Sequence, residues 1–357
     1  MKAPLLDDAA AIKRLDPGGM LAAVRGLPDQ CRAAWDLAQG LKLPPIYRNI
    51  DRIVVLGMGG SAIAGDLWRA LLQRECAVPV FNVRGYDLPP FADERTLVIA
   101  SSFSGDTEEV LSAFEQALAV PAPKIAITTG GQLLTTARAN GIPIFSYEHK
   151  GEPRSAIGWG LMPLLAVGES LRLMQGVGKD VEEMVGVLDT LVSEIGADIP
   201  SAENAAKQMA EDLRDKLPVI YGAGPLTEVA KRWKTQLNES GKTWAFFEEL
   251  PEIHHNAIIG YGLPKRIAAG TAVVFLESET LVHPRVRLRY GYTKGMLNSE
   301  GIATLEVETW GRSALAQMMS LVQFGDYVST YLAFLYRVDP TPTTVIDELK
   351  AWLKEQR

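Results

Sequence analysis

The sequence is poor in the residues that build disulfide frameworks and metal clusters. Its 357 residues include only two cysteines, Cys31 and Cys76, which do not form a CxxC motif, and four histidines that form no HExxH pair. Disulfide scaffolds and the common zinc motifs need such residues at short, regular spacing. The sequence therefore predicts a fold held together by apolar cores and a functional site without a metal ion.

A long apolar segment and an excess of positive charge are also missing. No stretch approaches the roughly 20 apolar residues of a membrane span, and the N-terminal "MKAPLLDDAAAIKRLD" lacks the apolar core of a signal peptide. The net charge is −7, whereas general nucleic-acid binders carry basic patches. We therefore expect a cytoplasmic protein without a membrane or nucleic-acid partner. Local hydrogen-bond donors can still bind a small anion in such a protein.

Residues 51–145 alternate short apolar runs with amphipathic stretches. Each run has the length of a β-strand and is bounded by glycine, proline or polar residues. Strands that alternate with helices predict a parallel sheet with helices on both faces, which is a doubly wound, flavodoxin-like α/β fold. The five predicted strands are "RIVVLG", "VPVFNV", "TLVIAS", "KIAITTG" and "IPIFSY".

The second half of the chain repeats this pattern. The segment "PVIYGAGPLTEVAKRWKTQLNE" aligns with "RIVVLGMGGSAIAGDLWRALLQ", which sets Gly222 and Gly224 against Gly57 and Gly59. Both segments read as a strand, a glycine-rich turn and a helix, so we expect two similar α/β domains. The predicted parts are a helical N-terminal arm (1–45), a first domain (46–180) and a second domain with a C-terminal helix (205–357).

Two loops of the first domain are rich in small polar residues. "GMGGSAIAG" contains Gly60 and Ser61, and "SSFSGDT" contains Ser102, Ser104 and Thr107, each loop directly after a predicted strand. Loops at the carboxyl ends of neighbouring parallel strands face one crevice, where backbone N–H groups and a helix N-terminus favour an anion. Serine and threonine are also common helix caps, but a cap needs one hydroxyl and not three. The two loops together therefore predict a phosphate site.

A dinucleotide site is the alternative for the first loop. Residues 57–62 fit the GxGxxG/A pattern of dinucleotide-binding turns. The next predicted strand ends without the acid that would bind a ribose hydroxyl, although Arg84 could bind a 2′-phosphate. A nicotinamide site has no use for the serine cluster of the second loop, so we favour a phosphate site of another kind.

These loops resemble the sugar isomerase (SIS) domain, whose phosphosugar sites use a serine- and threonine-rich loop at a strand end. Three motifs narrow the resemblance: "NESGK" (238–242), "ELPEIHHN" (249–256) and the C-terminal "DYVSTYLAFLYRVDPTPTTVIDELKAWL". Together they resemble the bifunctional phosphoglucose/phosphomannose isomerases over nearly the whole chain. The resemblance implies two SIS domains and interconversion of glucose 6-phosphate and mannose 6-phosphate with fructose 6-phosphate, without a cofactor.

The resemblance also implies roles for individual residues. The residues that would bind the substrate phosphate are Gly60, Ser61, Ser102, Ser104 and Thr107. The residues that would take part in catalysis are Arg154, Glu239, His255 and Lys350, with Thr343 admitting both C2 epimers. His254, beside His255, leaves open which imidazole acts. Asp106 stands where related loops often carry asparagine, and we expect its carboxylate to point away from the phosphate.

These residue types suit an isomerisation through an enediol. An imidazole can open the sugar ring, a carboxylate can move a proton between C2 and C1, and a guanidinium can stabilise the enediolate. Fifteen residues separate Glu239 from His255, so the spacing does not force them together. The resemblance suggests a homodimer in which His255 reaches the site of the neighbouring subunit. The alternatives are a non-catalytic SIS-type phosphosugar sensor and an NADP-dependent oxidoreductase.

Overall fold

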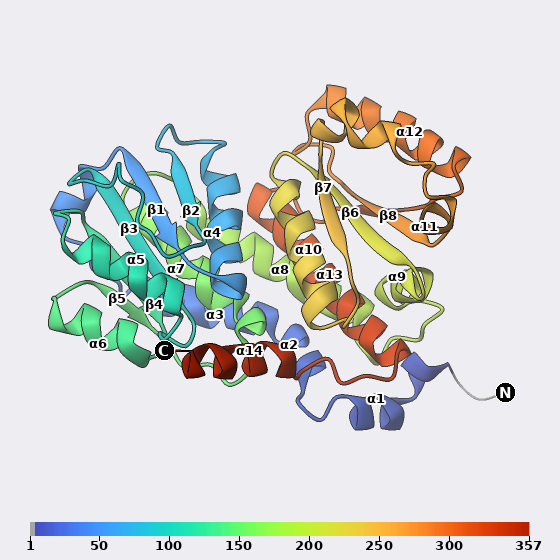
Figure 1. Cartoon of the computed structure of the whole chain (residues 1–357), viewed down its shortest axis with the longest axis horizontal. Coiled ribbons are helices and arrows are strands. Elements are labelled where there is room, and N and C mark those ends of the chain that lie inside the picture. The colour runs from blue at the N-terminus through green and yellow to red at the C-terminus, as the bar shows by residue number, and fades with distance from the viewer. Residues whose placement is uncertain (1–3, 357) are drawn as a thin grey trace.

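Two parallel sheets form the centre of the structure, a computed structural model that describes residues 4–356 (Figure 1). The first sheet has the strand order β2-β1-β3-β4-β5. Strand β2 therefore lies on one side of β1, and β3, β4 and β5 follow on the other side. The strands of this sheet are β1 (Arg52–Leu56), β2 (Val80–Val83), β3 (Thr96–Ser102), β4 (Lys124–Thr128) and β5 (Ile144–Ser146). These are the five strands that the apolar runs predict.

Helices cover both faces of this sheet because successive residues of its central strands point to opposite sides. Ile53 and Val55 of β1 belong to one apolar core, whereas Val54 and Leu56 belong to the other. The helices of this half are α4 (Gly59–Leu72), α5 (Glu108–Leu118), α6 (Gly131–Ala139) and α7 (Ile157–Ser170), with a short helix η3 (Pro153–Ser155) before α7. The first half therefore has the predicted doubly wound architecture.

The second sheet is also parallel, with the strand order β7-β6-β8-β9. Its strands are β6 (Leu217–Ala223), β7 (Phe246–Leu250), β8 (Thr271–Glu277) and β9 (Ala303–Glu308). Its helices are α9 (Ala205–Leu213), α10 (Leu226–Glu239), α11 (Lys265–Ala269), α12 (Pro284–Ser299) and α13 (Ala314–Leu335), with short helices η4 (Glu252–His255) and η5 (Ala257–Ile259) after β7. The predicted repeat of the first half is thus confirmed.

The N-terminal residues form the expected helical arm. Its helices are η1 (Leu5–Asp7), α1 (Ala9–Leu15), α2 (Met20–Arg25), α3 (Leu27–Ala38) and η2 (Pro45–Arg48). Helix α3 packs against α7 of the first half and against α8 (Val177–Ile195), which in turn packs against α13 of the second half. The buried Lys207 Nζ binds Asp7 Oδ1 of the arm at 3.0 Å. The arm therefore contacts both halves of the molecule.

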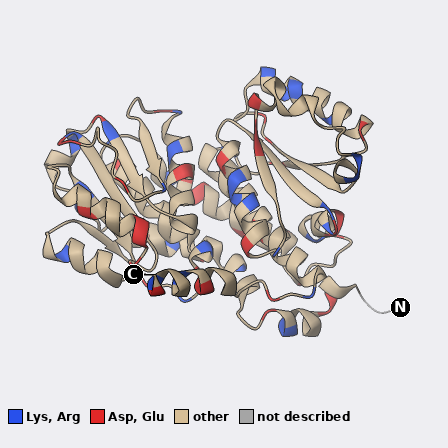
Figure 2. Ribbon diagram, viewed as in Figure 1, with Lys and Arg blue, Asp and Glu red and all other residues tan. Residues whose placement is uncertain are grey.

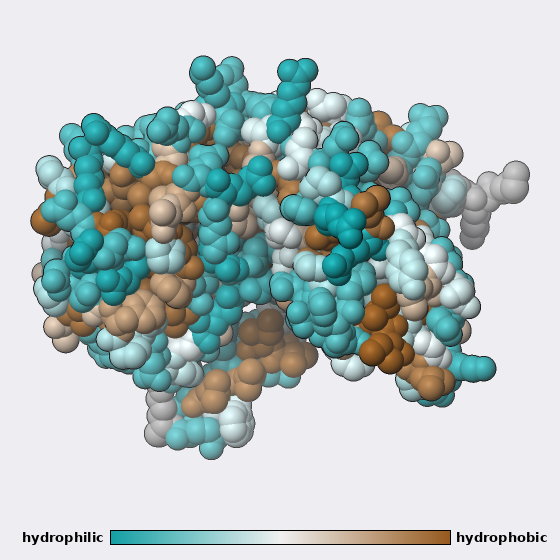
Figure 3. Space-filling model, turned by 90° about the horizontal axis from the view of Figure 1, so that it is seen from above, coloured by the Kyte–Doolittle hydropathy of each residue, from teal (hydrophilic) through white to brown (hydrophobic). Residues whose placement is uncertain are grey.

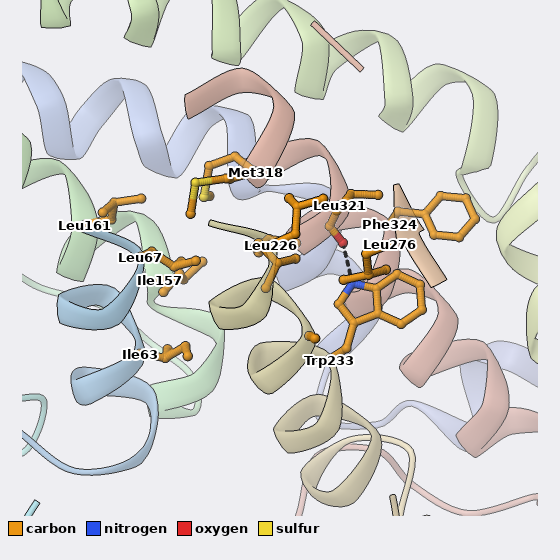
Figure 4. Packing of buried hydrophobic residues seen from close by; sticks show 14 of the residues in the cluster. Ile63, Leu67, Ile157, Leu161, Leu226, Trp233, Leu276, Met318, Leu321 and Phe324 are labelled. Carbon is orange, nitrogen blue, oxygen red and sulfur yellow. Dashed lines mark hydrogen bonds between the residues drawn. The ribbon is translucent and has the colours of Figure 1, made fainter. Parts of the chain in front are cut away.

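The two halves share one continuous apolar core. In Figure 4, Leu67 of α4 and Ile157 of α7 lie beside Leu226 of α10 and Met318 of α13. The Trp233 indole, within the same core, donates a hydrogen bond to the carbonyl oxygen of Leu321 at 2.7 Å. Burying apolar area is the main stabilising term in folding. The shared apolar core therefore fixes α4 and α10 against each other.

Charged residues add a second contact between α4 and α10 (Figure 2). Lys231 Nζ of α10 lies 2.8 Å from the buried Asp66 carboxylate of α4, and Arg69 of α4 pairs with Glu228 of α10. The residue numbers rise on one helix as they fall on the other, so the two helices run antiparallel. The N-terminus of α4 therefore lies beside the C-terminus of α10.

Helix α14 (Thr344–Glu355) ends the described chain and buries none of its residues. It forms the lobe at the lower edge of Figure 3, where apolar residues are visible along it. They include Val345, Leu349 and Trp352, of which Trp352 is 55% exposed. Among residues 4–356, no helix combines the length and apolar composition needed to cross a membrane.

Candidate active site

The two polar loops of the first half meet, as the topology predicts. They follow β1 and β3, which are adjacent and parallel, at the position where the strand order reverses. The backbone N–H of Phe103 donates a hydrogen bond to Ser61 Oγ at 3.1 Å. This contact joins the start of α4 to the serine-rich loop after β3.

The hydroxyl groups of the second loop gather at one place. Ser102 Oγ lies 2.8 Å from Thr107 Oγ1 and accepts a hydrogen bond from Gly105 N at 3.0 Å. Ser104 Oγ accepts from Asp106 N at 3.2 Å. Thr107 is the N-cap residue of α5, yet its side chain makes no capping hydrogen bond. The cluster is therefore more than a helix cap, and it faces the N-terminal end of α5, where an anion is favoured.

Asp106 is turned toward the next helix. Its carboxylate accepts a hydrogen bond from the backbone N–H of Gln132, in the first turn of α6, at 2.8 Å. This agrees with the expectation that the charge points away from the serine cluster, because the N-terminus of α6 stabilises a carboxylate.

Gly60 brings Arg154 against the first loop. A side chain at Gly60 would place its Cβ 2.9 Å from the carbonyl oxygen of Pro153 and 3.1 Å from the Arg154 nitrogen. Real Cβ atoms do not approach backbone atoms this closely without displacement. Glycine is therefore needed here so that η3, which carries Arg154, can lie on the turn before α4.

The Arg154 guanidinium is buried, with 1% of the residue exposed. Nε donates to Ser240 Oγ at 3.0 Å, and Nη2 donates to the carbonyl oxygens of Pro340 and Thr341 at 2.9 and 2.6 Å. Nη1 lies 3.9 Å from Glu239 Oε2. Burial lowers the pKa of Arg154 from its ordinary value, but an arginine side chain stays charged in proteins. The structure therefore brings a fixed cation and the predicted base together.

Glu239 is the last residue of α10, and its side chain is 29% exposed. The antiparallel packing of α4 and α10 explains its position, because it sets this helix end beside the start of α4. A carboxylate from the second half thus lies 3.9 Å from the Arg154 guanidinium, whose backbone packs against the turn at Gly60 in the first half.

Sequence reasoning missed Lys242, which belongs to the same cluster. Its Nζ donates to the Glu239 carbonyl oxygen at 2.6 Å and to the Pro342 carbonyl oxygen at 2.5 Å. Burial, and next the nearby charge of Arg154, lower its pKa. Lys242 and Arg154 therefore hold three consecutive carbonyls, those of residues 340–342, beside Glu239. The only signal in the sequence is the lysine that closes "NESGK".

Two further predicted site residues, Thr343 and Lys350, follow residues 340–342 in the chain. Thr343 is the N-cap residue of α14, and its side chain makes no capping hydrogen bond. Lys350 lies exposed on α14 and makes no ion pair within the described part of the chain. The structure thus places Thr343 at the cluster through its neighbours but does not bring Lys350 into contact with Glu239 or Arg154.

The two adjacent histidines have different surroundings. His254 Nε2 lies 2.8 Å from Thr293 Oγ1 of α12 and Nδ1 lies 3.2 Å from the Pro251 carbonyl oxygen. Burial lowers the pKa of His254. His255 is exposed. His254 therefore has a structural partner on α12, which favours His255 as the imidazole that contacts a ligand.

Within one chain, His255 lies at the opposite end of the second sheet from Glu239. Helix α10 begins after the carboxyl end of β6 and returns along the sheet for 14 residues, which is about 21 Å. His255 follows the carboxyl end of β7, which is parallel to β6. The structure of the single chain therefore does not bring His255 to the cluster around Glu239.

Arg84, the residue that would bind a 2′-phosphate in a dinucleotide site, is already paired. Its guanidinium contacts the buried carboxylate of Asp66 on α4. Asp66 also accepts a hydrogen bond from Asn82 at 2.7 Å. This arrangement disfavours the dinucleotide interpretation, because binding an external phosphate would take Arg84 from a buried carboxylate.

Known proteins share both the sequence and the fold. The chain is 40% identical over 337 residues to a bifunctional phosphoglucose/phosphomannose isomerase of Caldicellulosiruptor bescii, which covers 94% of this chain and 99% of that protein. The chain belongs to the bifunctional phosphoglucose/phosphomannose isomerase family. A member of this family from Aquifex aeolicus is 34% identical, over 85% of this chain and 90% of its own length.

Two further comparisons concern the C-terminal half of the chain and the fold. Residues 202–353 match the family model described as the bacterial phospho-glucose isomerase C-terminal SIS domain, and this range contains Glu239, His255 and Lys350. A crystal structure of a hypothetical protein from Thermus thermophilus superposes with a TM-score of 0.76 over 99% of this chain and 94% of that one, at 18% identity. This likeness shows the fold alone, and the fold is the one predicted.

Proposed function

We propose that this chain interconverts glucose 6-phosphate and mannose 6-phosphate with fructose 6-phosphate through an enediol intermediate. The observation that carries the proposal is the meeting of Glu239, Arg154 and the two hydroxyl-rich loops at one place, in a chain of this family. An aldose–ketose isomerisation needs an anion site, a base and a charge that stabilises the enediolate. The cluster offers all three from side chains and backbone alone.

In this proposal the first half binds the phosphate. The backbone at Gly60 and the hydroxyl groups of Ser61, Ser102, Ser104 and Thr107 donate hydrogen bonds to its oxygens. Hydrogen bonds to a charged acceptor contribute about 1.5–3 kcal/mol each, roughly twice those between neutral groups. The short distances within the serine cluster support a common ligand for these hydroxyls.

The second half supplies the base. Glu239 removes the proton from C2 of the open-chain aldose phosphate and returns it to C1, while a proton moves between the C1 and C2 oxygens. Arg154 stabilises the negative charge that develops on these oxygens. Its burial makes this electrostatic effect stronger than it would be in water. Thr343 leaves room at C2 for either epimer, and Lys350 reaches the substrate from α14.

Ring opening requires an acid/base group, and we propose that the imidazole of His255 of the partner subunit provides it in a homodimer. The distance between the two ends of α10 supports this, because His255 and Glu239 of one chain lie at opposite ends. Ile259 and Leu263, which follow His255, are 87% and 76% exposed, and α14 next to Glu239 has an exposed apolar face. In an isologous dimer, the surface around Ile259 and Leu263 of each subunit would pack against the apolar face of α14 of the other subunit. The same contact would therefore occur twice.

We also propose the domain division that the sequence predicts, 46–180 and 205–357 after an N-terminal arm, and a cytoplasmic location. The two sheets lie within these ranges. Cys31 and Cys76 are both unpaired, which suits a reducing compartment.

The test is to incubate the purified chain with fructose 6-phosphate and to follow glucose 6-phosphate and mannose 6-phosphate separately by NMR. We expect both aldose phosphates to form and to equilibrate. Binding of fructose 6-phosphate without turnover would instead support the phosphosugar sensor. A change in nicotinamide absorbance that requires NADP would support the oxidoreductase.

A further inference from the structure

A buried ion pair lies directly behind Arg154. Arg232 of α10 and Asp326 of α13 are 1% and 5% exposed, and Arg232 Nη2 donates to Asp326 Oδ2 at 2.8 Å. The same nitrogen donates to the carbonyl oxygen of Arg154 at 2.8 Å. A charged side chain from one helix thus bridges a carboxylate from a second helix and the backbone that carries the predicted enediolate-stabilising group.

Packing alone does not account for this pair. Replacing a buried ion pair by apolar residues of similar volume is often neutral or stabilising, because both charges must give up their hydration. Burial raises the pKa of Asp326. Among the described residues, Arg232 Nε is buried without a hydrogen-bond partner. An energetically costly pair at this position calls for a role that an apolar pair could not fill.

The contacts of Arg154 show what the pair does. Its carbonyl oxygen is held by Arg232 near the middle of α10, and its Nε is held by Ser240 after the end of the same helix. On the other side, the turn at Gly60 presses against the Pro153 carbonyl and the Arg154 nitrogen. The backbone of Arg154 is therefore enclosed between the phosphate loop and α10, and its side chain lies along α10 toward Glu239.

The charges are also balanced around Arg154. Its guanidinium is close enough to Arg232 for the two positive charges to oppose each other, and Asp326 offsets this repulsion for both. Without Asp326, Arg232 would lose the carboxylate it pairs with, while Arg154 would keep the partly exposed Glu152 and Glu239. The carboxylate thus offsets the charge of Arg232 behind Arg154 without occupying the guanidinium nitrogens of Arg154.

We propose that Arg232 and Asp326 are positioning residues, which hold Arg154 at the distance and direction needed to stabilise the enediolate. The inference rests on the proposed isomerase function. A displacement of about 1 Å in a catalytic group can cost about 100-fold in rate. Since Arg154 acts on charge that develops during the reaction, its displacement lowers kcat more than it changes KM.

The test compares Arg232→Met with Lys207→Met. Lys207 is also fully buried, pairs with Asp7 and lies over the Tyr331 ring of α13, but it is absent from the contacts of Arg154. For Arg232→Met we expect kcat for fructose 6-phosphate to fall about 100-fold, with KM changed by less than about threefold. For Lys207→Met we expect a lower unfolding temperature and a kcat within about twofold of wild type. Equal kcat values for the two variants would overturn the proposal.

Two conservative variants keep the test decisive if Arg232→Met does not fold. Arg232→Lys keeps the charge and can still donate to the Arg154 carbonyl, so we expect its kcat to stay within about tenfold of wild type. Asp326→Asn keeps the shape and removes the charge, and we expect a fall in kcat of about tenfold or more. An Asp326→Asn variant with wild-type kcat would contradict the proposed role.

A structural measurement separates this proposal from the proposed function. In a crystal structure of Asp326→Asn, we expect the 3.0 Å contact between Arg154 Nε and Ser240 Oγ to lengthen or break. This readout does not depend on which reaction the chain performs. If the wild type lacks isomerase activity but the contact breaks, the proposed function fails and the positioning role stands. An unchanged contact, with or without activity, overturns the positioning role.

Discussion

The two sheets are built alike but end differently. Arg52 of β1 pairs with Thr96 of β3, and at the equivalent position Leu217 of β6 pairs with Thr271 of β8. Six residues further along, β3 ends in Ser102 whereas β8 ends in Glu277. The same place in the fold thus carries a hydroxyl in the first half and a carboxylate in the second.

We expect this difference to decide which half binds a phosphate. In the second half, Glu277, Glu279 and Glu308 line a cavity of about 460 Å³ at the strand ends, and its lining also includes the basic residues Arg287 and Arg312. Like charges at short distance would repel a phosphate there. The hydroxyl groups of the first half offer donors without that repulsion. We therefore expect the repeated fold to provide a phosphate site in its first half and none at the equivalent place in its second half.

In the proposed reaction, the second half contributes through another part of its structure. Its proposed base, Glu239, stands at the C-terminus of α10, at the opposite edge from the strand-end loops of its own sheet. The antiparallel contact between α4 and α10 brings this edge to the proposed phosphate loop of the first half. The comparison teaches that equivalent edges of a repeat need not have equivalent roles.

The largest expected effect is on the base itself. For Glu239→Gln we expect turnover of fructose 6-phosphate to fall by about 10²–10⁴-fold, since that is the usual contribution of a general base. Binding should persist, because the phosphate loops are untouched. The measurements are kcat by a coupled assay and affinity by calorimetry.

Glu152→Gln is a matched control for this experiment. The Glu152 carboxylate is 30% exposed and lies 3.4 Å from Arg154 Nη1, so it resembles Glu239 in exposure and in its cationic neighbour. We expect kcat to change by less than about fivefold, the size of a partly screened charge effect. A similar loss in both variants would show that any carboxylate beside Arg154 matters, and Glu239 would not be the base.

The next prediction tests whether Glu239 and His255 of one active site come from the same chain or from two different chains. A heterodimer that pairs a Glu239→Gln chain with a His255→Ala chain has one site with both groups intact if His255 acts across the interface. We expect about half of the wild-type activity from this heterodimer, isolated through two different affinity tags, although each variant alone is inactive.

A second heterodimer gives the opposite readout. It pairs a wild-type chain with a chain that carries both substitutions. If His255 acts in the site of the other subunit, one site then lacks the histidine and the other lacks the glutamate, so neither is complete. We expect this heterodimer to be inactive. If it keeps about half of the activity while the first is inactive, Glu239 and His255 of the same chain act together, and the proposed interface is wrong.

A smaller effect compares the strand ends directly. Ser104 and Glu279 occupy equivalent exposed positions, eight residues after Thr96 and Thr271. For Ser104→Ala we expect KM for fructose 6-phosphate to rise about tenfold or more, because one hydrogen bond to a charged group contributes about 1.5–3 kcal/mol. For Glu279→Ser we expect KM within about twofold of wild type. A larger change for Glu279→Ser would place a substrate contact in the second half.

Much of the fold follows from the sequence because its strands are buried on both faces. Every residue of β3 is buried, so its run of apolar residues predicts a strand without ambiguity. Strand β7, "FFEEL", was missed, since it lies at the edge of the second sheet and only Leu250 is buried. Glutamate residues are depleted in strands, and backbone pairing with β6 outweighs that tendency here.

The site follows from the sequence only in part. The meeting of Ser61 with the loop after β3 is a consequence of topology, which the order of strands and helices predicts. The meeting of Arg154 with Glu239 depends on how two domains pack, and the sequence indicates it only through a family resemblance. Lys242 and Arg232 act through backbone carbonyls of residues about 100 and 78 positions away. Such contacts leave no periodic pattern in a sequence.

The smallest expected effect concerns Lys242, which joins the C-terminus of α10 to the segment before α14. Its lowered pKa means that the charged form, which holds the carbonyls of Glu239 and Pro342, is present below that pKa and is lost as the pH rises. The loss therefore begins at a lower pH than for an ordinary lysine with a pKa of 10.5. We expect kcat/KM of the wild type to fall by a few-fold on the alkaline side. In Lys242→Arg the fall should move to higher pH, because a guanidinium stays charged there. Identical alkaline limbs in both proteins would show that this contact between the second half and the C-terminal segment does not support the reaction.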